Sequence, residues 1–138
     1  MGTELALGPY VVSAEEIVGF ARDFDPQPFH LDGDSEQARL TGGLIASGWH
    51  TCAIAMRMFC DAYLLDSGSL GAPGVDEVRW VRPVRPGDTL SGTSRVTEAR
   101  PMRSREGVGI VHLDHEIKNG AGEVVCTMKN VGMMRMCS

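Results

Sequence analysis

The chain has 138 residues, enough for one ordinary domain with its own core but too few for two, so we expect a single domain over residues 1–138. Hydrophobic residues make up 43% and charged residues 22%, and no apolar run approaches the roughly 20 residues that span a bilayer, which excludes a transmembrane protein. A formal net charge of −5 without any block of Lys or Arg argues against a nucleic-acid partner. Neither end shows a secretion signal or a lipidation motif, so we expect a cytoplasmic protein without membrane attachment.

Helical patterns dominate the first half of the chain. Ser13 followed by Glu16 is a capping box that predicts the start of a helix. The apolar face of this helix consists of Ile17, Phe20, Ala21 and Phe24. The helix must end by Asp25, because Pro26 and Pro28 cannot continue it.

A loop and two further helices are predicted next. Residues 25–33 read as a rigid loop, and Asp34 or Ser35 caps a short helical turn through Arg39. Residues 44–65 are apolar on nearly all sides, which is typical of a helix enclosed by the rest of the fold. One stripe of this helix holds Leu44, Gly48, Thr51, Ala55, Met58 and Ala62. A second stripe, which we expect to face solvent or a partner subunit, holds Ser47, His50, Arg57 and Asp61.

The second half of the chain carries strand patterns. The predicted strands are Val75–Val81, Thr89–Thr97, Val108–Ile117 and Val124–Val131. The last two are expected to form a hairpin, and the Gly-rich stretch 66–74 is a connection within the domain. One long helix and a run of antiparallel strands predict an α+β fold, in which a curved sheet covers one side of the helix. The apolar surface that stays uncovered predicts a dimer.

The segment 25–30 concentrates groups that can carry acid–base chemistry. Asp25, Gln27 and His30 lie among prolines that stiffen the backbone and so reduce the entropy lost when reactive groups are held in place. A histidine titrates near working pH, and a carboxylate beside it can share a water with it or orient it as a base. The alternative interpretation is that Asp25 caps a turn and His30 is an ordinary side chain.

Two glycines, Gly42 and Gly43, stand at the predicted start of the 44–65 helix. Glycines at such a position leave N–H groups and the positive end of the helix dipole open to a substrate oxygen, as an oxyanion hole requires. The alternative is a tight helix entry with close packing.

Taken in order, these segments resemble a known family. The pattern D-x-(N/Q)-P-x-H at residues 25–30, followed by GGLIASGWHT at 42–51, is similar to the MaoC-like dehydratases, also called the hydratase-2 group of hot-dog-fold proteins. Residues 80–90, WVRPVRPGDTL, resemble the strand and turn that follow the central helix in these proteins, so the likeness covers about residues 10–136. Gln27 departs from the pattern, since most members have Asn there, and it lengthens the reach of the amide by one methylene.

The resemblance implies a fold, an activity and a set of roles. The fold is a hot-dog sheet wrapped around the 44–65 helix, in a homodimer or a higher assembly. The substrates are acyl thioesters such as acyl-CoA, with coenzyme A entering only as part of the substrate and without a metal or another cofactor. Asp25 and His30 match the catalytic pair that adds water to a 2-enoyl thioester or removes it from a (3R)-3-hydroxyacyl thioester, and Gly43 matches the glycine whose N–H faces the thioester carbonyl. The substrate-binding positions are Gln27, Pro28, Gly42, Leu44 and Thr51.

Two other functions would use the same ligands. A hot-dog thioesterase needs a carboxylate for attack at the carbonyl carbon, usually on the central helix, and Asp61 near its far end is a poor candidate. A non-catalytic acyl-CoA-binding module would keep the pocket but would not need both Asp25 and His30. The presence of this pair ranks hydration or dehydration first.

Other reactive side chains favour structural interpretations. His112 and Asp114 fall on one face of a strand and His115 on the other, which argues against a metal site formed by these residues with Glu116. His50 is more typical of a packed or interface residue than of a catalyst. Ser47 lacks the Gly-x-Ser-x-Gly elbow of a serine hydrolase.

The cysteines, arginines and methionines do not point to one particular function. Without a CxxC pair, the cysteines are predicted to be free thiols rather than disulfides or zinc ligands: Cys52, Cys60, Cys126 and Cys137. The arginines of the predicted strand region fit either coenzyme A phosphates or solvated strand edges: Arg79, Arg82 and Arg85. The methionines of the C-terminal segment fit core filling, with acyl-chain contact as the alternative: Met133, Met134 and Met136.

Overall fold

The computed structural model describes residues 2–66 and 68–135, and its centre is one antiparallel sheet in the order β1-β3-β4-β5-β2. The strands are β1 (Glu4–Val11), β2 (Gly74–Trp80), β3 (Thr89–Pro101), β4 (Val108–Lys118) and β5 (Val124–Arg135). The helices are α1 (Ala14–Phe24), α2 (Pro28–Leu31), α3 (Glu36–Leu40) and α4 (Gly48–Ala62), and a 3-10 turn η1 (Leu64–Asp66) follows α4. The predicted α+β class is confirmed.

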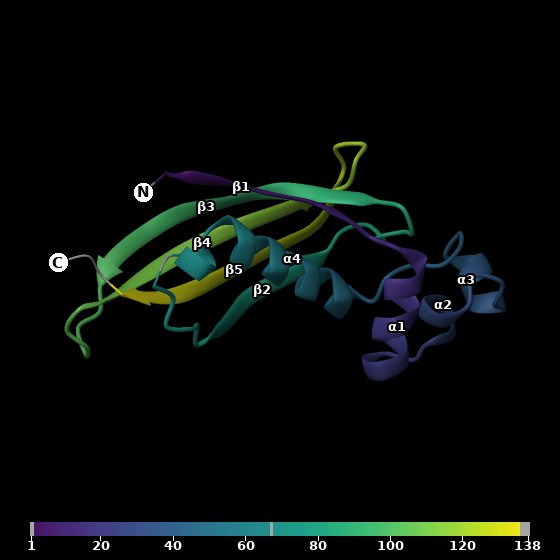
Figure 1. Cartoon of the computed structure of the whole chain (residues 1–138), viewed down its shortest axis with the longest axis horizontal. Helices are drawn as coiled ribbons and strands as arrows, with labels where there is room; N and C mark the ends of the chain where they lie inside the picture. Colours follow the sequence, from purple (N-terminus) through teal and green to yellow (C-terminus); the bar gives the residue numbers. More distant parts are fainter. Residues whose placement is uncertain (1, 67, 136–138) are drawn as a thin grey trace.

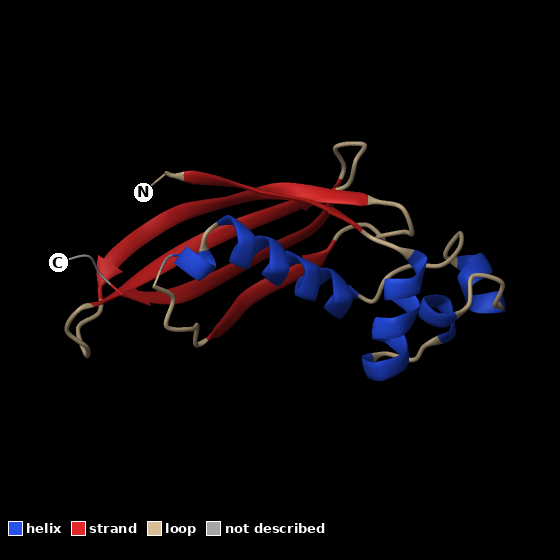
Figure 2. Cartoon of the chain, viewed as in Figure 1, coloured by secondary structure: helices blue, strands red, loops and turns tan. Residues whose placement is uncertain are grey.

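The sheet curves around α4, and the core fills the space between them. Figure 1 shows α4 lying along one face of the sheet, with α1, α2 and α3 grouped beyond one end of it. The helix directs Ile54, Ala55, Met58 and Phe59 into the core, where they meet Leu7, Leu90, Ile117, Val125, Cys126 and Met128 from the sheet. One helix wrapped by one antiparallel sheet is the hot-dog arrangement (Figure 2). Among the described residues, no helix has the length and apolarity needed to cross a membrane.

The edge strand β1 was not predicted from the sequence. It pairs antiparallel with β3, and its register shifts between Leu7 and Tyr10. Gly8 and Pro9 interrupt the alternation of side chains at this point, which hides the strand pattern. A Cβ atom on Gly8 would lie 2.6 Å from the carbonyl oxygen of Leu90, so the close approach of the two backbones requires a glycine there.

The central helix is shorter than the predicted 44–65 segment at both ends, because it begins at Gly48 and ends at Ala62. Before that point the backbone forms hydrogen bonds with other segments. The N–H of Ile45 donates to the Phe29 carbonyl at 3.1 Å, and the N–H of Ala46 donates to the Val84 carbonyl at 2.8 Å. These bonds hold residues 44–46 in a non-helical path that delivers Ser47 as the N-cap of α4.

Other local predictions fare differently. The capping box on α1 and the Ser35 cap of α3 are both confirmed. The predicted 25–33 loop contains the short helix α2, which Pro28 can start because its missing N–H would have no helical partner there. The β4–β5 hairpin is confirmed, with pairing from Val108 opposite Arg135 to Lys118 opposite Val124.

The stripe of α4 predicted to face solvent or a partner subunit is divided. Arg57 and Asp61 are exposed and form an ion pair at 2.9 Å. Ser47 and His50, in contrast, are buried, because α1 lies against the first turn of α4 and covers them. Cys52, Cys60 and Cys126 are free thiols, while Cys137 and Met136 lie outside the described residues. Met133 and Met134 are half-buried in β5.

Candidate active site

Asp25 stands at the end of α1, where it is the C-cap residue. Its Oδ1 accepts a hydrogen bond from the Gln27 amide at 2.6 Å, and its Oδ2 accepts one from the Ser47 hydroxyl at 2.7 Å. These two bonds, with a smaller contribution from His30, hold the pKa of the Asp25 carboxyl below its usual value although partial burial opposes them. Asp25 is therefore a carboxylate at neutral pH.

His30 is buried in α2 and faces the same carboxylate. Its Nδ1 lies 2.7 Å from the carbonyl oxygen of Ile45, and since a carbonyl only accepts, this nitrogen carries a proton. In the neutral ring, Nε2 then has a free lone pair, and it lies 3.3 Å from Oδ2 of Asp25. Two acceptors this close leave no room for a water between them, but a water beside the pair can donate one hydrogen to each.

Ser47 belongs to this site, although the sequence placed it on the stripe expected to face solvent or a partner subunit and disfavoured it as a nucleophile. Its side chain is fully buried, donates to Asp25 and accepts from the N–H of Trp49 at 3.3 Å. It therefore caps α4 and holds the carboxylate at the same time. The signal that was available is a serine directly before an apolar helix, which predicts a cap; its contact with Asp25 depends on the packing of α1 against α4.

The predicted oxyanion position at Gly43 needs a correction. The N–H of Gly43 donates to the carbonyl of Ala38 at 2.7 Å, so it closes the end of α3 and is not directed at a ligand. Gly48 is the residue that opens α4 and lines the pocket with Asp25 and His30. First-turn N–H groups have no carbonyl of their own helix to bind, which makes Gly48 the better candidate.

The other predicted substrate positions divide between the pocket and its supports. Gln27 and Thr51 line the pocket. Pro28 is exposed at the start of α2, Gly42 lies under the Arg85 guanidinium, and Leu44 packs against the core. These last three lie outside the lining, and of them only Gly42 and Leu44 belong to the segment that leads to α4.

The pocket itself has a volume of about 580 Å³. Besides the polar pair, aromatic and aliphatic side chains form much of its wall: Phe29, Ile45, Trp49, Trp80, Val81 and Val84. Trp80 packs edge-on against Trp49, with ring centroids 5.2 Å apart. Gly48 is covered by the same indole, because a Cβ atom there would lie 2.5 Å from it. A polar pair at one side of an apolar cavity suits an apolar ligand with one reactive group.

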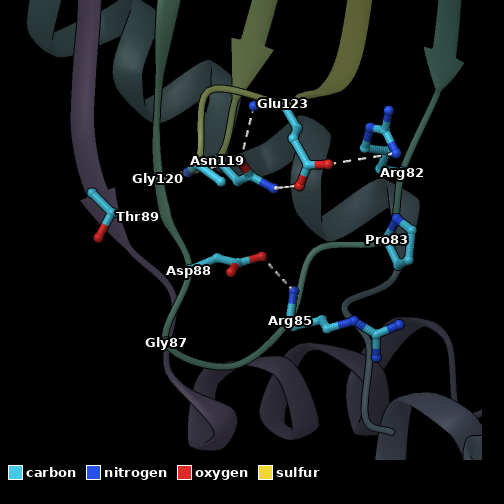
Figure 3. Close-up of a pocket in the computed structure, with 10 residues that line it drawn as sticks. Arg82, Pro83, Arg85, Gly87, Asp88, Thr89, Asn119, Gly120 and Glu123 are labelled. Carbon is cyan, nitrogen blue, oxygen red and sulfur yellow. Dashed lines mark hydrogen bonds and ion pairs between the residues drawn. The ribbon is translucent and has the colours of Figure 1, made fainter. Parts of the chain in front are cut away.

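Figure 3 shows a second, more polar pocket of about 490 Å³. Arg82 and Pro83 line both pockets. Arg82 lies 3.7 Å from Glu123, and the backbone N–H of Arg85 donates to Asp88 at 2.9 Å (Figure 3). The Arg85 side chain reaches back and donates to the Thr41 carbonyl at 2.6 Å, which ties the second pocket to the loop before α4.

The remaining candidates from the sequence lie away from both pockets or serve other contacts. His115 is buried and stacks on Phe59, and its ring nitrogens meet Ser94 at 2.7 Å and Asn130 at 2.6 Å. His112 pairs with Glu98 at 3.1 Å, and Arg79 pairs with Glu77 at 2.7 Å. The predicted division of His112 and His115 between two faces of the strand is confirmed.

Comparison with known proteins agrees with this architecture. Residues 2–119 match the MaoC like domain, and the chain belongs to this family. It resembles the MaoC-like dehydratase from Rhodospirillum rubrum, at 36% identity and a TM-score of 0.88, over 100% of this chain and 94% of that one.

Two further relatives widen the comparison. The R-hydratase PhaJ1 from Pseudomonas aeruginosa is 22% identical, with a TM-score of 0.76 over 100% of this chain and 83% of that one, and it shares the fold. The uncharacterized protein YdeM of Bacillus subtilis (strain 168) is 29% identical over 122 residues, which cover 86% of each chain.

Proposed function

We propose that the protein is a hydratase or dehydratase of acyl thioesters, which adds water to a 2-enoyl-CoA or removes it from a (3R)-3-hydroxyacyl-CoA. The observation that carries this proposal is the pair of facing acceptors, Asp25 Oδ2 and His30 Nε2, at 3.3 Å on the wall of an apolar pocket. Membership of the MaoC-like domain family and the likeness to a dehydratase support the reaction class.

The proposed mechanism uses the groups already described. A water held by Asp25 and His30 attacks C3 of the enoyl group, and its proton passes to Nε2 of His30. The electron pair of the double bond moves toward the thioester oxygen, where the N–H of Gly48 stabilises the developing charge. The proton on His30 then adds to C2, so one water is consumed and the thioester stays intact. The Asp25 carboxylate stabilises the imidazolium between the two steps.

The two pockets suggest how the substrate lies. The aromatic wall of the first pocket suits the acyl group, and Arg82 and Pro83 mark the way to the polar pocket, where the carrier of the thioester would extend. The proposed chemistry proceeds through side chains, a backbone N–H and water, with coenzyme A as part of the substrate. We further propose that the active molecule is a homodimer.

Kinetics of matched variants test the proposal. Crotonyl-CoA hydration is measured for the wild type, Asp25→Asn and His30→Asn, with Asp61→Asn and His112→Asn as controls, because those two residues lie outside the pocket in ion pairs. We expect the first two to be slowed about 10²-fold or more and the controls to stay within about twofold. A wild type inactive on short, long and branched enoyl-CoAs, or site variants as fast as the controls, would contradict the proposal.

The thioesterase alternative loses its candidate carboxylate. Asp61 is exposed near the end of α4, paired with Arg57, and it is not part of the pocket that holds His30. The carboxylate in that pocket, Asp25, is the one proposed for hydration.

A further inference from the structure

A second polar contact joins α1 to α4, and on α4 it lies about one turn after the Asp25–Ser47 bond. Nε2 of His50 lies 3.5 Å from Oε2 of Glu16. The His50 ring also stacks on Phe20, with centroids 4.8 Å apart and planes 10° from parallel. His50 follows Ser47 by three residues on the same helix, so both face α1.

Glu16 is fixed by groups from two other positions. Its Oε2 accepts the hydroxyl of Tyr10 in β1 at 2.5 Å, and its Oε1 accepts the backbone N–H of Ser13 at 3.2 Å. The carboxylate that meets His50 is therefore anchored to the sheet and to the start of α1. This chain of contacts connects β1, α1 and α4.

The other nitrogen of the ring, Nδ1 of His50, is buried without a hydrogen-bond partner among the described residues. An unsatisfied buried polar atom destabilises the folded state, and an apolar side chain beside Phe20 would avoid that cost. Burial also lowers the pKa of His50, although Glu16 opposes this effect, so the ring is neutral at neutral pH. What the histidine provides at this position is a single N–H, at Nε2, directed at Glu16.

We propose that Glu16 and His50 are a positioning pair for the active site: their contact sets α1 against the first turn of α4 and thereby holds Asp25 on Ser47 and opposite His30. Asp25 ends α1 and Ser47 begins α4, so any slip between the two helices changes the 2.7 Å bond directly. It also changes the 3.3 Å distance, because His30 is hydrogen-bonded to the Ile45 carbonyl just before α4. The inference rests on the proposed function for its kinetic test only.

Two amide variants of His50 separate positioning from packing. The side-chain amide of Gln places its NH2 near the position of Nε2, whereas that of Asn places it near Nδ1, where the structure offers no partner. We expect His50→Asn to lower kcat for crotonyl-CoA hydration about tenfold or more with KM changed less than about twofold, and His50→Gln to restore most of the loss.

The pH profile gives a signature that loss of packing alone would not produce. A weaker bond from Ser47 raises the pKa of Asp25, so the acidic limb of the kcat profile moves to higher pH in His50→Asn. The groups that face Asp25 are Gln27, His30 and Ser47. The charged group that faces His50 is Glu16, which in turn binds Tyr10, and Arg57 lies near Tyr10. In Glu16→Gln, removal of a negative charge alone would move the limb to lower pH, whereas displacement of α1 moves it to higher pH.

Titration of the Asp25 carboxyl by NMR tests the inference without turnover, and so separates it from the proposed function. We expect a higher pKa in His50→Asn and in Glu16→Gln than in the wild type, and a value near the wild type in His50→Gln. Circular dichroism checks that each variant is folded. If the His50 variants do not fold, Glu16→Gln tests the same contact from the other side. The same Asp25 pKa in His50→Asn and His50→Gln, or an Asp25 pKa in Glu16→Gln that equals the wild-type value, would overturn the inference.

Discussion

Ser47 shows how one side chain can serve helix formation and chemistry together. It caps α4 and donates to the carboxylate proposed to hold the attacking water. Neither role requires an unusual sequence, and a serine before a helix is common. Its place in the site follows from the path of residues 42–46, which are not helical. Because α4 begins only at Gly48, the end of α1 can reach its N-cap residue.

Replacing Ser47 by Ala should affect both roles. Loss of the cap costs about 1 kcal/mol of folding stability. Loss of the hydrogen bond raises the pKa of Asp25, because that bond favours the charged form, and the acidic limb of the kcat/KM profile moves to higher pH. Ser35→Ala, which removes the cap of α3, is the control for stability alone. Identical pH profiles for the two variants would contradict the role assigned to Ser47.

Cys52 is a second residue with a testable ionisation. A hydrogen bond from the Cys126 thiol and a weaker one from Trp80 lower the pKa of Cys52 to about 7, although burial opposes them. The same interaction raises the pKa of Cys126, which keeps its proton. We expect the rate of Cys52 alkylation by iodoacetamide, followed by peptide mass spectrometry, to rise through this pH and its midpoint to move higher in Cys126→Ala. An unmoved midpoint would show that Cys126 does not stabilise the thiolate.

At the scale of elements, the site is built where three chain segments end or begin. Asp25 ends α1, His30 lies in α2, and Gly48 begins α4. The sequence was sufficient to predict α1, the short helix α3, the β4–β5 hairpin and the residues of the polar pair. Each of these depends on local signals, namely caps, turn residues and a proline-stiffened segment.

The features that sequence reasoning missed depend on contacts between distant segments. The start of α4 was predicted four residues early, because residues 44–46 are as apolar as the helix that follows them. Only the backbone bonds of this segment to Phe29 and Val84 show its non-helical path. The same early start placed the expected oxyanion donor at Gly43, whose N–H is bound to the Ala38 carbonyl in the structure. Strand β1 went unpredicted because Gly8 and Pro9 break its pattern, while its pairing with β3 is non-local.

The first residue of α4 offers a test of this packing. Ala normally favours a helix over Gly by about 0.5–1 kcal/mol, yet a methyl at Gly48 would lie 2.5 Å from Trp80. We expect Gly48→Ala to destabilise the protein by about 1–3 kcal/mol in urea unfolding, since the indole must move. Gly19→Ala in α1, where a Cβ atom meets nothing within 4 Å, should be neutral or stabilising. A stabilised Gly48→Ala variant would contradict the contact with Trp80.

At the scale of the whole molecule, one side of the fold carries exposed apolar side chains around the edge strand β2. Trp49, Val75, Trp80 and Val81 are between 46% and 62% exposed. β2 has a neighbour on one side only, since it ends the sheet next to β5. An open edge flanked by apolar side chains favours pairing with a second copy of the chain.

Sedimentation at micromolar concentration tests this arrangement. We expect twice the chain mass for the wild type and a monomer for Val75→Lys, because a charge on the β2 edge opposes pairing. Val11→Lys is the matched control, since Val11 is 64% exposed on the opposite edge strand β1. A monomeric wild type, or dissociation by Val11→Lys alone, would contradict a dimer formed through β2.

The proposed reaction is defined by the atom of the substrate that receives the oxygen of water. Incubation of the protein with a 2-enoyl-CoA in ¹⁸O-labelled water, followed by mass spectrometry, reads this directly. Hydration through Asp25 and His30 predicts one ¹⁸O atom in the hydroxyl at C3, an intact thioester and no free thiol. Label in a released carboxylate, together with free coenzyme A, would contradict hydration and establish a thioesterase instead.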